Sequence, residues 1–191
     1  MCVTVSKMSG KLLGLQGINT NPLTNPFCQR MAKKPGCICA RCYSVQMLRT
    51  SRRSCAPAWE RNGALLSKPL EQIPVVTAAL CRFSAHGELL NRQHYENYCI
   101  IARAHPRTTF ALFTKRKDLV EPDLAPPNLV LVYSNPVVDK IMDKPPPGFH
   151  KVFNVIDKLD IPTNCSAESC FKCGKCYYRN AGPRCIIERI K

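Results

Sequence analysis

The sequence predicts an α/β fold in which parallel strands and helices alternate to form a partial (βα) barrel. Short apolar runs typical of buried strands are separated by stretches with helical periodicity, as in βα units around a parallel sheet. The chain has 191 residues, which is too few for a full eight-unit barrel of about 250 residues. Polar residues follow the predicted strands, as expected where the carboxyl ends of parallel strands line a ligand site.

The predicted elements follow one another along the chain with few gaps. A short first strand is expected at 11–16, and helices are expected at 42–53 and 56–66. The middle of the chain then alternates strand, helix, strand and short helix at 77–84, 89–104, 109–114 and 115–120. Two more strands are expected at 129–133 and 152–156, with a helical stretch at 136–144 between them.

Composition places the chain among ordinary folded proteins. Apolar residues make up 45% of it, which is enough to bury a core and argues against global disorder. No run of about 18 apolar residues occurs, and the N-terminal stretch lacks a small-residue cleavage site, so we expect neither a membrane span nor a signal peptide. We expect a partial barrel with an N-terminal cysteine loop at 1–160 and a cysteine-rich segment at 161–191.

Thirteen cysteines are present, an odd number that excludes a complete disulfide framework. Without a signal peptide, so much cysteine indicates a reducing compartment and metal binding. Eight of the cysteines fall into two groups. The first cysteine group is Cys28, Cys37, Cys39 and Cys42, and the second cysteine group is Cys165, Cys170, Cys173 and Cys176. Cys81 and Cys99 lie in apolar surroundings and are expected to act as small core residues.

The spacing within each group favours an iron–sulfur cluster, with zinc as the alternative. In the first group, Cys28, Cys39 and Cys42 could bind three irons of a four-iron cluster and leave one iron open, unless Cys37 is a fourth ligand. The second group has the spacing C-x4-C-x2-C-x2-C, whose core resembles the ferredoxin-type run and would close its site with four ligands. Structural zinc usually takes two C-x2-C pairs held further apart, although zinc remains the alternative in the C-terminal site.

Basic residues accompany both cysteine groups. The formal net charge is +15, and residues 1–59 carry nine Lys or Arg and no acid. Nearby cations stabilise thiolates, which are the form that binds metal. The same charge would also suit contact with nucleic acid or with an acidic host protein. Both interpretations stay open at this stage.

The residues that end the predicted strands are candidates for contacts with a bound ligand. Each strand is followed by groups that can form hydrogen bonds, and the carboxyl ends of parallel strands meet at one edge. The candidates are Ser84, His86, Gly87, Glu88 and Asn135. Arg82 stands inside an apolar strand and needs a partner for its charge, for which Glu88 or a bound carboxylate would serve.

Several short motifs occur together in the order NPLTNPFC…CICARCY, RFSAHGEL, LFTKR, LVYSNP and CFKCGKC. This order resembles the radical SAM superfamily and, more narrowly, small phage-borne proteins of the gene product eighty-eight type. The resemblance covers roughly residues 10–178. It implies a four-iron–four-sulfur cluster on Cys28, Cys39 and Cys42 whose open iron binds S-adenosylmethionine. Gly87 and Glu88 would then meet the methionyl group, with His86 in place of the first glycine of the Gly-Gly-Glu motif.

Two functions from different classes follow. One is a radical-SAM-like protein with one or two four-iron clusters, with S-adenosylmethionine as a further ligand and with an unidentified substrate. The other is a metal-stabilised module without catalytic activity that binds nucleic acid or a host protein through its basic surface. A phage-encoded protein of either kind would act in the host cytoplasm.

Overall fold

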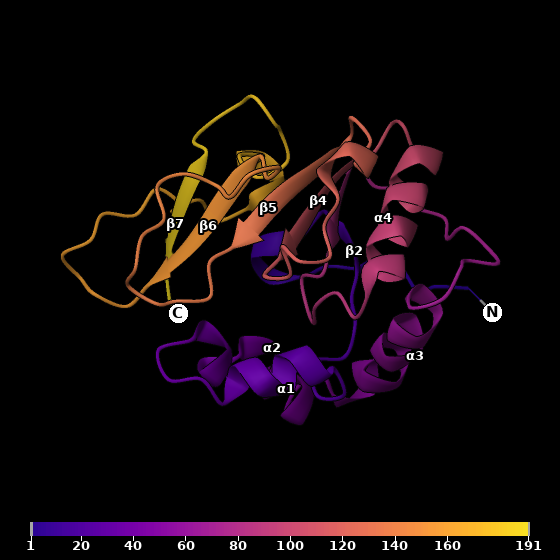
Figure 1. Cartoon of the computed structure of the whole chain (residues 1–191), viewed down its shortest axis with the longest axis horizontal. Helices are drawn as coiled ribbons and strands as arrows, with labels where there is room; N and C mark the ends of the chain where they lie inside the picture. Colours follow the sequence, from indigo (N-terminus) through magenta and orange to yellow (C-terminus); the bar gives the residue numbers. More distant parts are fainter. Residues whose placement is uncertain (1, 191) are drawn as a thin grey trace.

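A single seven-stranded sheet organises the computed structural model, which describes residues 2–190 (Figure 1). The strands lie in the sheet in the order in which they follow in the chain, from β1 to β7. β1 pairs antiparallel with β2, and every other neighbouring pair is parallel. Because β1 and β7 lie at opposite ends of this order, the sheet is open and does not form a closed barrel. The predicted α/β class with parallel strands is therefore confirmed.

The bounds of the elements are as follows. The strands are β1 (Ser6–Lys7), β2 (Gln16–Ile18), β3 (Leu80–Phe83), β4 (Thr109–Thr114), β5 (Leu129–Ser134), β6 (Lys151–Ile156) and β7 (Cys185–Arg189). The α-helices are α1 (Pro26–Ala32), α2 (Tyr43–Arg49), α3 (Ala56–Leu66), α4 (Arg92–Ala104) and α5 (Cys170–Cys173). Short 3₁₀ helices are η1 (Gly10–Leu12), η2 (Ile38–Arg41), η3 (Arg53–Cys55) and η4 (Pro122–Leu124). No helix within residues 2–190 has the length and apolar character that a membrane crossing needs.

The two faces of the sheet bury two separate cores, because successive side chains of a strand point to opposite sides. On one face, Phe83 and Phe110 pack with Tyr98 of α4 in the larger core, which also contains Cys81 and Cys99 as predicted. A second, smaller core on the other face is formed by strand residues together with Tyr177 of the C-terminal segment. Its buried members are Leu15, Leu80, Ala111, Phe113, Val130, Val132 and Tyr177.

The C-terminal segment is part of the same sheet. It contributes β7, which pairs in parallel with β6 from Val152↔Cys185 to Ile156↔Arg189. Before β7, the segment crosses the face of the smaller core, where Cys170 and Cys176 pack against it. Residues 161–190 therefore cover one face of the sheet and supply one of its edges.

Most of the predicted elements are present, and the agreement is best for buried strands. The strand expected at 109–114 is β4, those at 129–133 and 152–156 are β5 and β6 with one added residue each, and the helix at 56–66 is α3. The helix expected at 89–104 begins only at Arg92, because the Asn91 side chain caps it by accepting a hydrogen bond from the His94 amide.

Three predictions of local structure were wrong. Residues 11–16 form tight turns, with Gly10 and Gly14 at positive φ, and strand β2 starts only at Gln16. No helix forms at 115–120, because side chains occupy the first amides: Glu88 accepts from Lys115 N–H and the Thr114 hydroxyl accepts from Arg116 N–H. No helix forms at 136–144 either, because the chain there bonds to distant carbonyls rather than to its own.

The segment between β2 and β3, which we call the first cysteine segment, carries the first cysteine group to the carboxyl ends of the strands. α1 begins here, and the side chain of Asn25 caps it by accepting hydrogen bonds from the amides of Phe27 and Cys28. Figure 1 shows α1 and α2 lying across the end of the sheet toward which β5 and β6 point. Neither α1 nor the edge strands β1 and β7 was expected from the sequence.

A tight turn after β3 joins this segment to the sheet. The amide of Thr20 donates to the carbonyl of His86 at 3.1 Å, and the amide of His86 donates to the Asn19 side chain at 3.0 Å. Gly87 has a φ of +81°, and a Cβ at this position would collide with the hydroxyl and carbonyl oxygens of Thr20. The close approach of the two loops therefore requires glycine.

We expect Gly87→Ala to lower the free energy of unfolding by about 3 kcal/mol or more, because strain at positive φ adds to the collision with Thr20. Gly36→Ala is the matched control, since Gly36 also has a positive φ (+71°) but open space around it. It should cost only about 1 kcal/mol. Urea unfolding of the two variants tests this expectation, and equal losses would contradict it.

Candidate metal centres

The first cysteine group lies on three consecutive short elements at the carboxyl edge. Cys28 is in the first turn of α1, Cys39 is on η2 and Cys42 immediately precedes α2. Cys37 caps η2, where its Sγ accepts a hydrogen bond from the amide of Cys39 at 3.4 Å. Cys37 is buried, whereas the other three are partly exposed. Local backbone structure therefore gives Cys37 a role that the other three do not share.

Lys115, just after β4, carries a positive charge toward the other three cysteines. Its Nζ donates to the Ser134 hydroxyl at 3.3 Å. Burial by itself would lower the pKa of Lys115, but attraction to Cys39, Glu88, Cys28 and Cys42 in their ionised forms outweighs this, and the pKa is raised. Three of the four predicted ligands are thus near enough to Lys115 for their charges to interact with it.

Burial keeps these thiols protonated in the metal-free protein. It raises the pKa of Cys39 to about 12, against the opposing charge of Lys115. The pKa of Cys28 is raised further for the same reason, with Glu88 adding to the effect. The expectation that neighbouring cations hold the thiols ionised is therefore wrong for these two residues. Any metal bound here would have to displace protons, so binding would weaken as the pH falls.

All four thiols of the second cysteine group line one small cavity of about 20 Å³ on the face of the smaller core. Ser169 caps α5, and Gly174 ends it in the left-handed conformation, which turns the chain back toward Cys176. Cys165 is held by Lys11, whose Nζ lies 3.2 Å from its Sγ and 2.7 Å from a Glu188 oxygen. We call this space the C-terminal cavity.

Two polar atoms at the C-terminal cavity are buried without a hydrogen-bond partner within the part of the chain that the structure describes. They are the Nε of Arg82 and the hydroxyl of Tyr177. Burial raises the pKa of Cys176 to about 12, and the charge of Arg82 opposes that rise. Buried polar groups are normally paired, so unpaired donors beside four thiols suit an anionic guest.

The thiols of the C-terminal cavity suit a cluster by their chemistry. Within residues 2–190, no three His, Cys, Asp or Glu side chains are arranged to hold one metal ion. A single zinc ion draws four ligands to about 2.3 Å from its centre. A four-iron cluster also takes four thiolates, so the donor set fits either zinc or a cluster, while the cavity itself has only about the volume of one water molecule.

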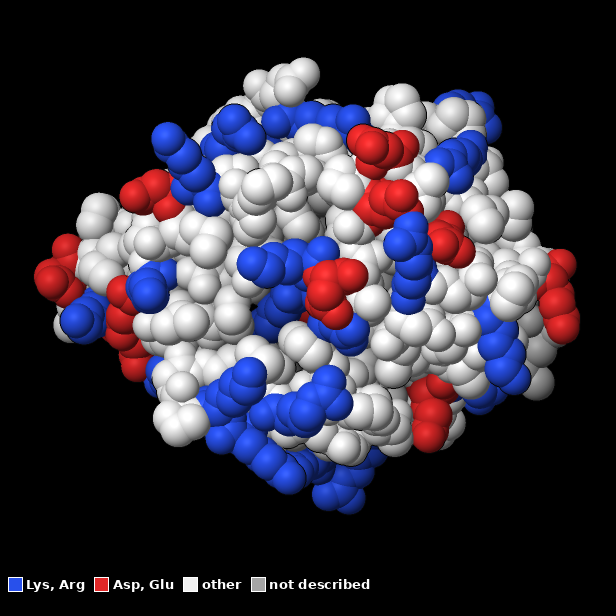
Figure 2. All heavy atoms as spheres, viewed as in Figure 1, with Lys and Arg blue, Asp and Glu red and all other residues white. Residues whose placement is uncertain are grey.

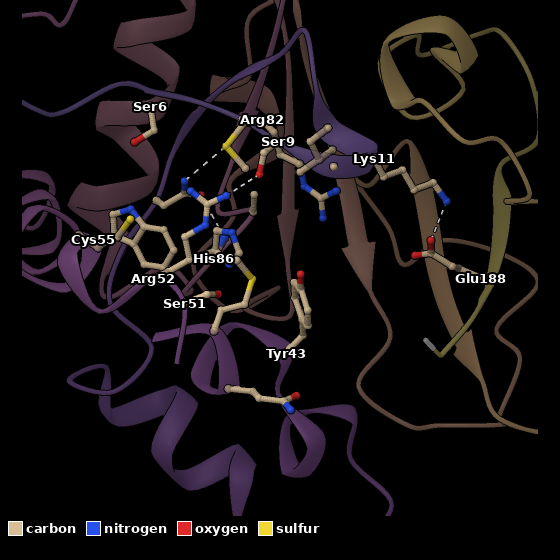
Figure 3. Close-up of a pocket in the computed structure, with 18 of the residues that line it drawn as sticks. Ser6, Ser9, Lys11, Tyr43, Ser51, Arg52, Cys55, Arg82, His86 and Glu188 are labelled. Carbon is tan, nitrogen blue, oxygen red and sulfur yellow. Dashed lines mark hydrogen bonds and ion pairs between the residues drawn. The ribbon is translucent and has the colours of Figure 1, made fainter. Parts of the chain in front are cut away.

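A much larger space, the central cavity, lies between the first cysteine segment and the sheet. Its volume is about 620 Å³, and residues from β1, η1, α2, β3, β6 and β7 line it. Figure 3 shows Arg52, Arg82 and His86 among the side chains of this cavity. Arg82 and Lys11 line both cavities, so they stand between the central cavity and the second cysteine group.

Of the five candidate ligand contacts at the strand ends, only His86 lines the central cavity. Its ring stacks on Trp59 with centroids 4.5 Å apart, and its Nδ1 lies 2.8 Å from the Ser44 hydroxyl. Burial, together with the charges of Arg82 and Arg52, lowers the pKa of His86 to about 4. His86 is therefore neutral at physiological pH.

The other four candidates are held by the protein itself. The hydroxyl of Ser84 lies 3.4 Å from that of Tyr98, and Gly87 packs against Thr20. The Asn135 amide donates to the side chain of Asn154 at 2.9 Å and to the carbonyl of Lys140. These three residues shape the carboxyl edge.

The carboxylate of Glu88 is likewise occupied by hydrogen bonds from the protein. It accepts from the amides of Leu89 and Lys115, at 2.9 and 2.8 Å, and from the Thr114 hydroxyl. The predicted pairing of Arg82 with Glu88 is therefore not formed. Instead, the guanidinium of Arg82 lies 3.6 Å from the centre of the Phe113 ring.

Sequence reasoning missed the residues that give the central cavity its charge. Arg52 and Ser9 are 43 positions apart in the chain and are joined by a hydrogen bond of 2.7 Å. No local sequence pattern predicts such a pair. The only signal was the acid-free first 59 residues.

Fold and site together define a class: an α/β protein with a mostly parallel sheet, one cysteine group at the carboxyl edge and another over one face. The family model described as Gene product 88 matches residues 9–164. The chain belongs to this family, which confirms the narrower of the two resemblances. No curated protein and no solved structure matches the chain. The relationship to the radical SAM superfamily stays a prediction.

Acid should destabilise the fold through its neutral histidines. The pKa is lowered to about 4 for His86 and His150 and to about 3 for His94, chiefly by burial. The unfolded chain takes up these protons near pH 6.5. Stability is therefore full above that pH and falls as the pH drops toward 4, by about 1.4 kcal/mol per pH unit for each of His86 and His94. The half-buried His150 contributes less, because solvent screens its charge.

In the variant His86→Gln, one histidine fewer should take up a proton on unfolding. Urea unfolding at pH 7, 6 and 5 measures the slope of the free energy of unfolding against pH, which we expect to be shallower in the variant. An unchanged slope would show that His86 is protonated in the folded protein.

Proposed function

We propose that this protein binds iron–sulfur clusters through its two cysteine groups, and that the second group holds a four-iron cluster. The observation that carries the proposal is the convergence of Cys165, Cys170, Cys173 and Cys176 on one cavity beside unpaired Arg82 and Tyr177. Such a cluster is anionic and supplies one-electron redox chemistry. The chain's own contribution would be the four thiolates, the nearby cations and exclusion of water.

For the first group, we propose Cys28, Cys39 and Cys42 as the ligands and Cys37 as a capping residue. Two observations support this division: the three cysteines share the charge of Lys115, and the Cys37 sulfur already accepts the Cys39 amide. Three thiolates would leave one iron open to a further ligand. The open sheet with its cysteine segment after the first parallel strand is the arrangement that the radical SAM resemblance implies, and it supports a cluster at this edge.

S-adenosylmethionine at the open iron is a separate question. The resemblance assigns its methionyl group to Gly87 and Glu88, yet the Glu88 carboxylate already accepts three hydrogen bonds from the protein. Binding in that manner would require the chain to give up at least one of them. We therefore limit the proposal to cluster binding.

Separate substitutions should empty the sites separately. After anaerobic purification we expect brown protein that contains iron and acid-labile sulfide. Cys39→Ala should lose the iron of the first site only, and Cys173→Ala that of the second only, because each change removes one thiolate from one group. Iron, sulfide and zinc per chain are the quantities to measure.

Cys2→Ala is the matched control, because Cys2 is exposed and belongs to neither group. It should leave the metal content unchanged. Colourless protein with stoichiometric zinc would overturn the proposal. Loss of all iron from either variant, with an unchanged circular dichroism spectrum, would indicate one shared cluster instead of two.

A second candidate function is the binding of nucleic acid at the surface of the first cysteine segment. Figure 2 shows Lys and Arg gathered over the lower face of the molecule, where α1 and α2 lie in Figure 1. The exposed Lys and Arg of residues 26–55, a range that includes α1 and α2, are Arg30, Lys33, Lys34, Arg41, Arg49 and Arg53. Neighbouring Tyr43 is 67% exposed and could stack on a base.

Charge removal on this face tests the second candidate. Replacement of Arg30, Lys33 and Lys34 by Gln should weaken binding to a DNA duplex and lower the dependence of log K on log salt, by about 0.9 for each phosphate that the variant no longer neutralises. Gel-shift titrations at several salt concentrations measure both effects. The control replaces the equally exposed Lys68, Lys117 and Lys144 by Gln. Equal losses from both variants would show that only net charge matters.

A further inference from the structure

The central cavity has the size and lining of a site for a small molecule. Its volume of about 620 Å³ falls within the range of about 300–1,000 Å³ usual for ligand pockets. Side chains from both ends of the chain and from the middle meet there, so the cavity exists only in the folded protein. Neither cysteine group lines it, and its chemistry can be considered separately.

Basic side chains dominate this lining. Six Lys or Arg line the cavity, against the single acid Glu188; they are Lys7, Lys11, Arg41, Arg52, Arg82 and Arg189. Lys11 is paired with Glu188 at 2.7 Å, and Arg41 is paired with Asp157 at 2.8 Å. The guanidinium of Arg189 donates to backbone carbonyls. Three of the six are thus already engaged.

Arg52 and Arg82 face the cavity without a carboxylate partner in the described chain. Arg52 donates to the Ser9 hydroxyl at 2.7 Å. Arg82 has a buried Nε that lacks any hydrogen-bond partner. The pKa of His86 is lowered chiefly by burial, and the positive charges of Arg82 and Arg52 lower it further. Two guanidinium groups therefore line one cavity without a carboxylate partner in the described chain.

An aromatic surface adjoins these two charges. The rings of Trp59 and His86 are stacked within 17° of parallel, and both residues line the cavity together with Tyr43. The neutral imidazole of His86 adds no charge of its own. Figure 3 shows the Arg52 side chain beside the labelled His86. The cavity thus combines a binding place for an anion with flat apolar surfaces.

We propose that the central cavity binds a phosphate ester that carries a planar ring, of the size of a nucleoside monophosphate, with Arg52 and Arg82 on the phosphate. Arginine presents a planar fork of N–H donors that matches phosphate oxygens. Tyr43, which lines the cavity and is 67% exposed, offers the ring a face for stacking. A cationic ligand is disfavoured, because it would meet two unpaired guanidinium groups. Binding of the phosphate ester does not require metal in either cysteine group, although Arg82 also lines the C-terminal cavity.

Isothermal titration calorimetry with the four ribonucleoside 5′-monophosphates tests this proposal. We expect at least one to bind the wild-type chain with a dissociation constant below 1 mM, a criterion of about −4 kcal/mol. The matching nucleoside without phosphate should bind at least tenfold more weakly. Arg52→Gln should weaken binding of the monophosphate at least tenfold.

Arg53→Gln is the matched control. Arg53 is exposed, does not line the cavity and donates to the Arg49 carbonyl, so its replacement removes the same charge from the neighbouring position. Binding by this variant should stay within twofold of wild type. Equal losses in the two arginine variants would overturn the proposal by showing that net charge alone attracts the ligand.

Three further results would overturn it: no monophosphate binds, the nucleoside binds as tightly as its monophosphate, or S-adenosylmethionine binds more tightly than any monophosphate. Iron analysis of the same preparations separates this proposal from the preceding one. Colourless protein that binds a monophosphate through Arg52 would leave the cavity proposal standing and the cluster proposal refuted.

Discussion

The buried carboxylate of Glu88 is the interaction on which the carboxyl edge of the sheet depends. It accepts hydrogen bonds from the amides of Leu89 and Lys115 and from the Thr114 hydroxyl, so it ties the end of β3 to the end of β4. Hydrogen bonds to a charged group contribute about 1.5–3 kcal/mol each, and a buried carboxylate without them would be very costly.

The backbone of the same residue extends this connection to the first cysteine segment. The carbonyl of Glu88 accepts from the Asn25 side chain at 2.9 Å, and Asn25 in turn caps the helix that carries Cys28. Cys28, Lys115 and the turn after β3 are therefore positioned through one residue. Glu88 therefore stands at the position expected for a ligand contact, while its side chain holds the site together.

How far the sequence predicts the structure depends on whether a feature is local. β4, β5 and β6 were found because strands buried on both faces are continuous apolar runs. β7 was missed because its short run CIIER follows a segment rich in Cys, Gly and Pro, and α1 was missed although Asn25 and Pro26 form a readable cap. The helix predicted at 115–120 failed because Glu88, distant in sequence, takes the Lys115 amide.

The same distinction applies to the candidate site. Close spacing was enough to group the eight cysteines, and the structure places the second four around one cavity. Asn135 was expected to contact a ligand. Its structural role could not be predicted from the sequence, because its partner Asn154 belongs to the next strand. Arg52, Arg82 and Ser9 come from three separate segments, and only tertiary folding brings them to one cavity.

The position of the second cysteine group has a consequence for biosynthesis. The face that it covers is formed mainly by β3 to β5, all of which leave the ribosome before residue 165. Until the segment from residue 161 to 190 emerges, that face has no cover. The covering of this face and the pairing of β7 with β6 thus depend on the same late segment, so both are completed in one stage of folding.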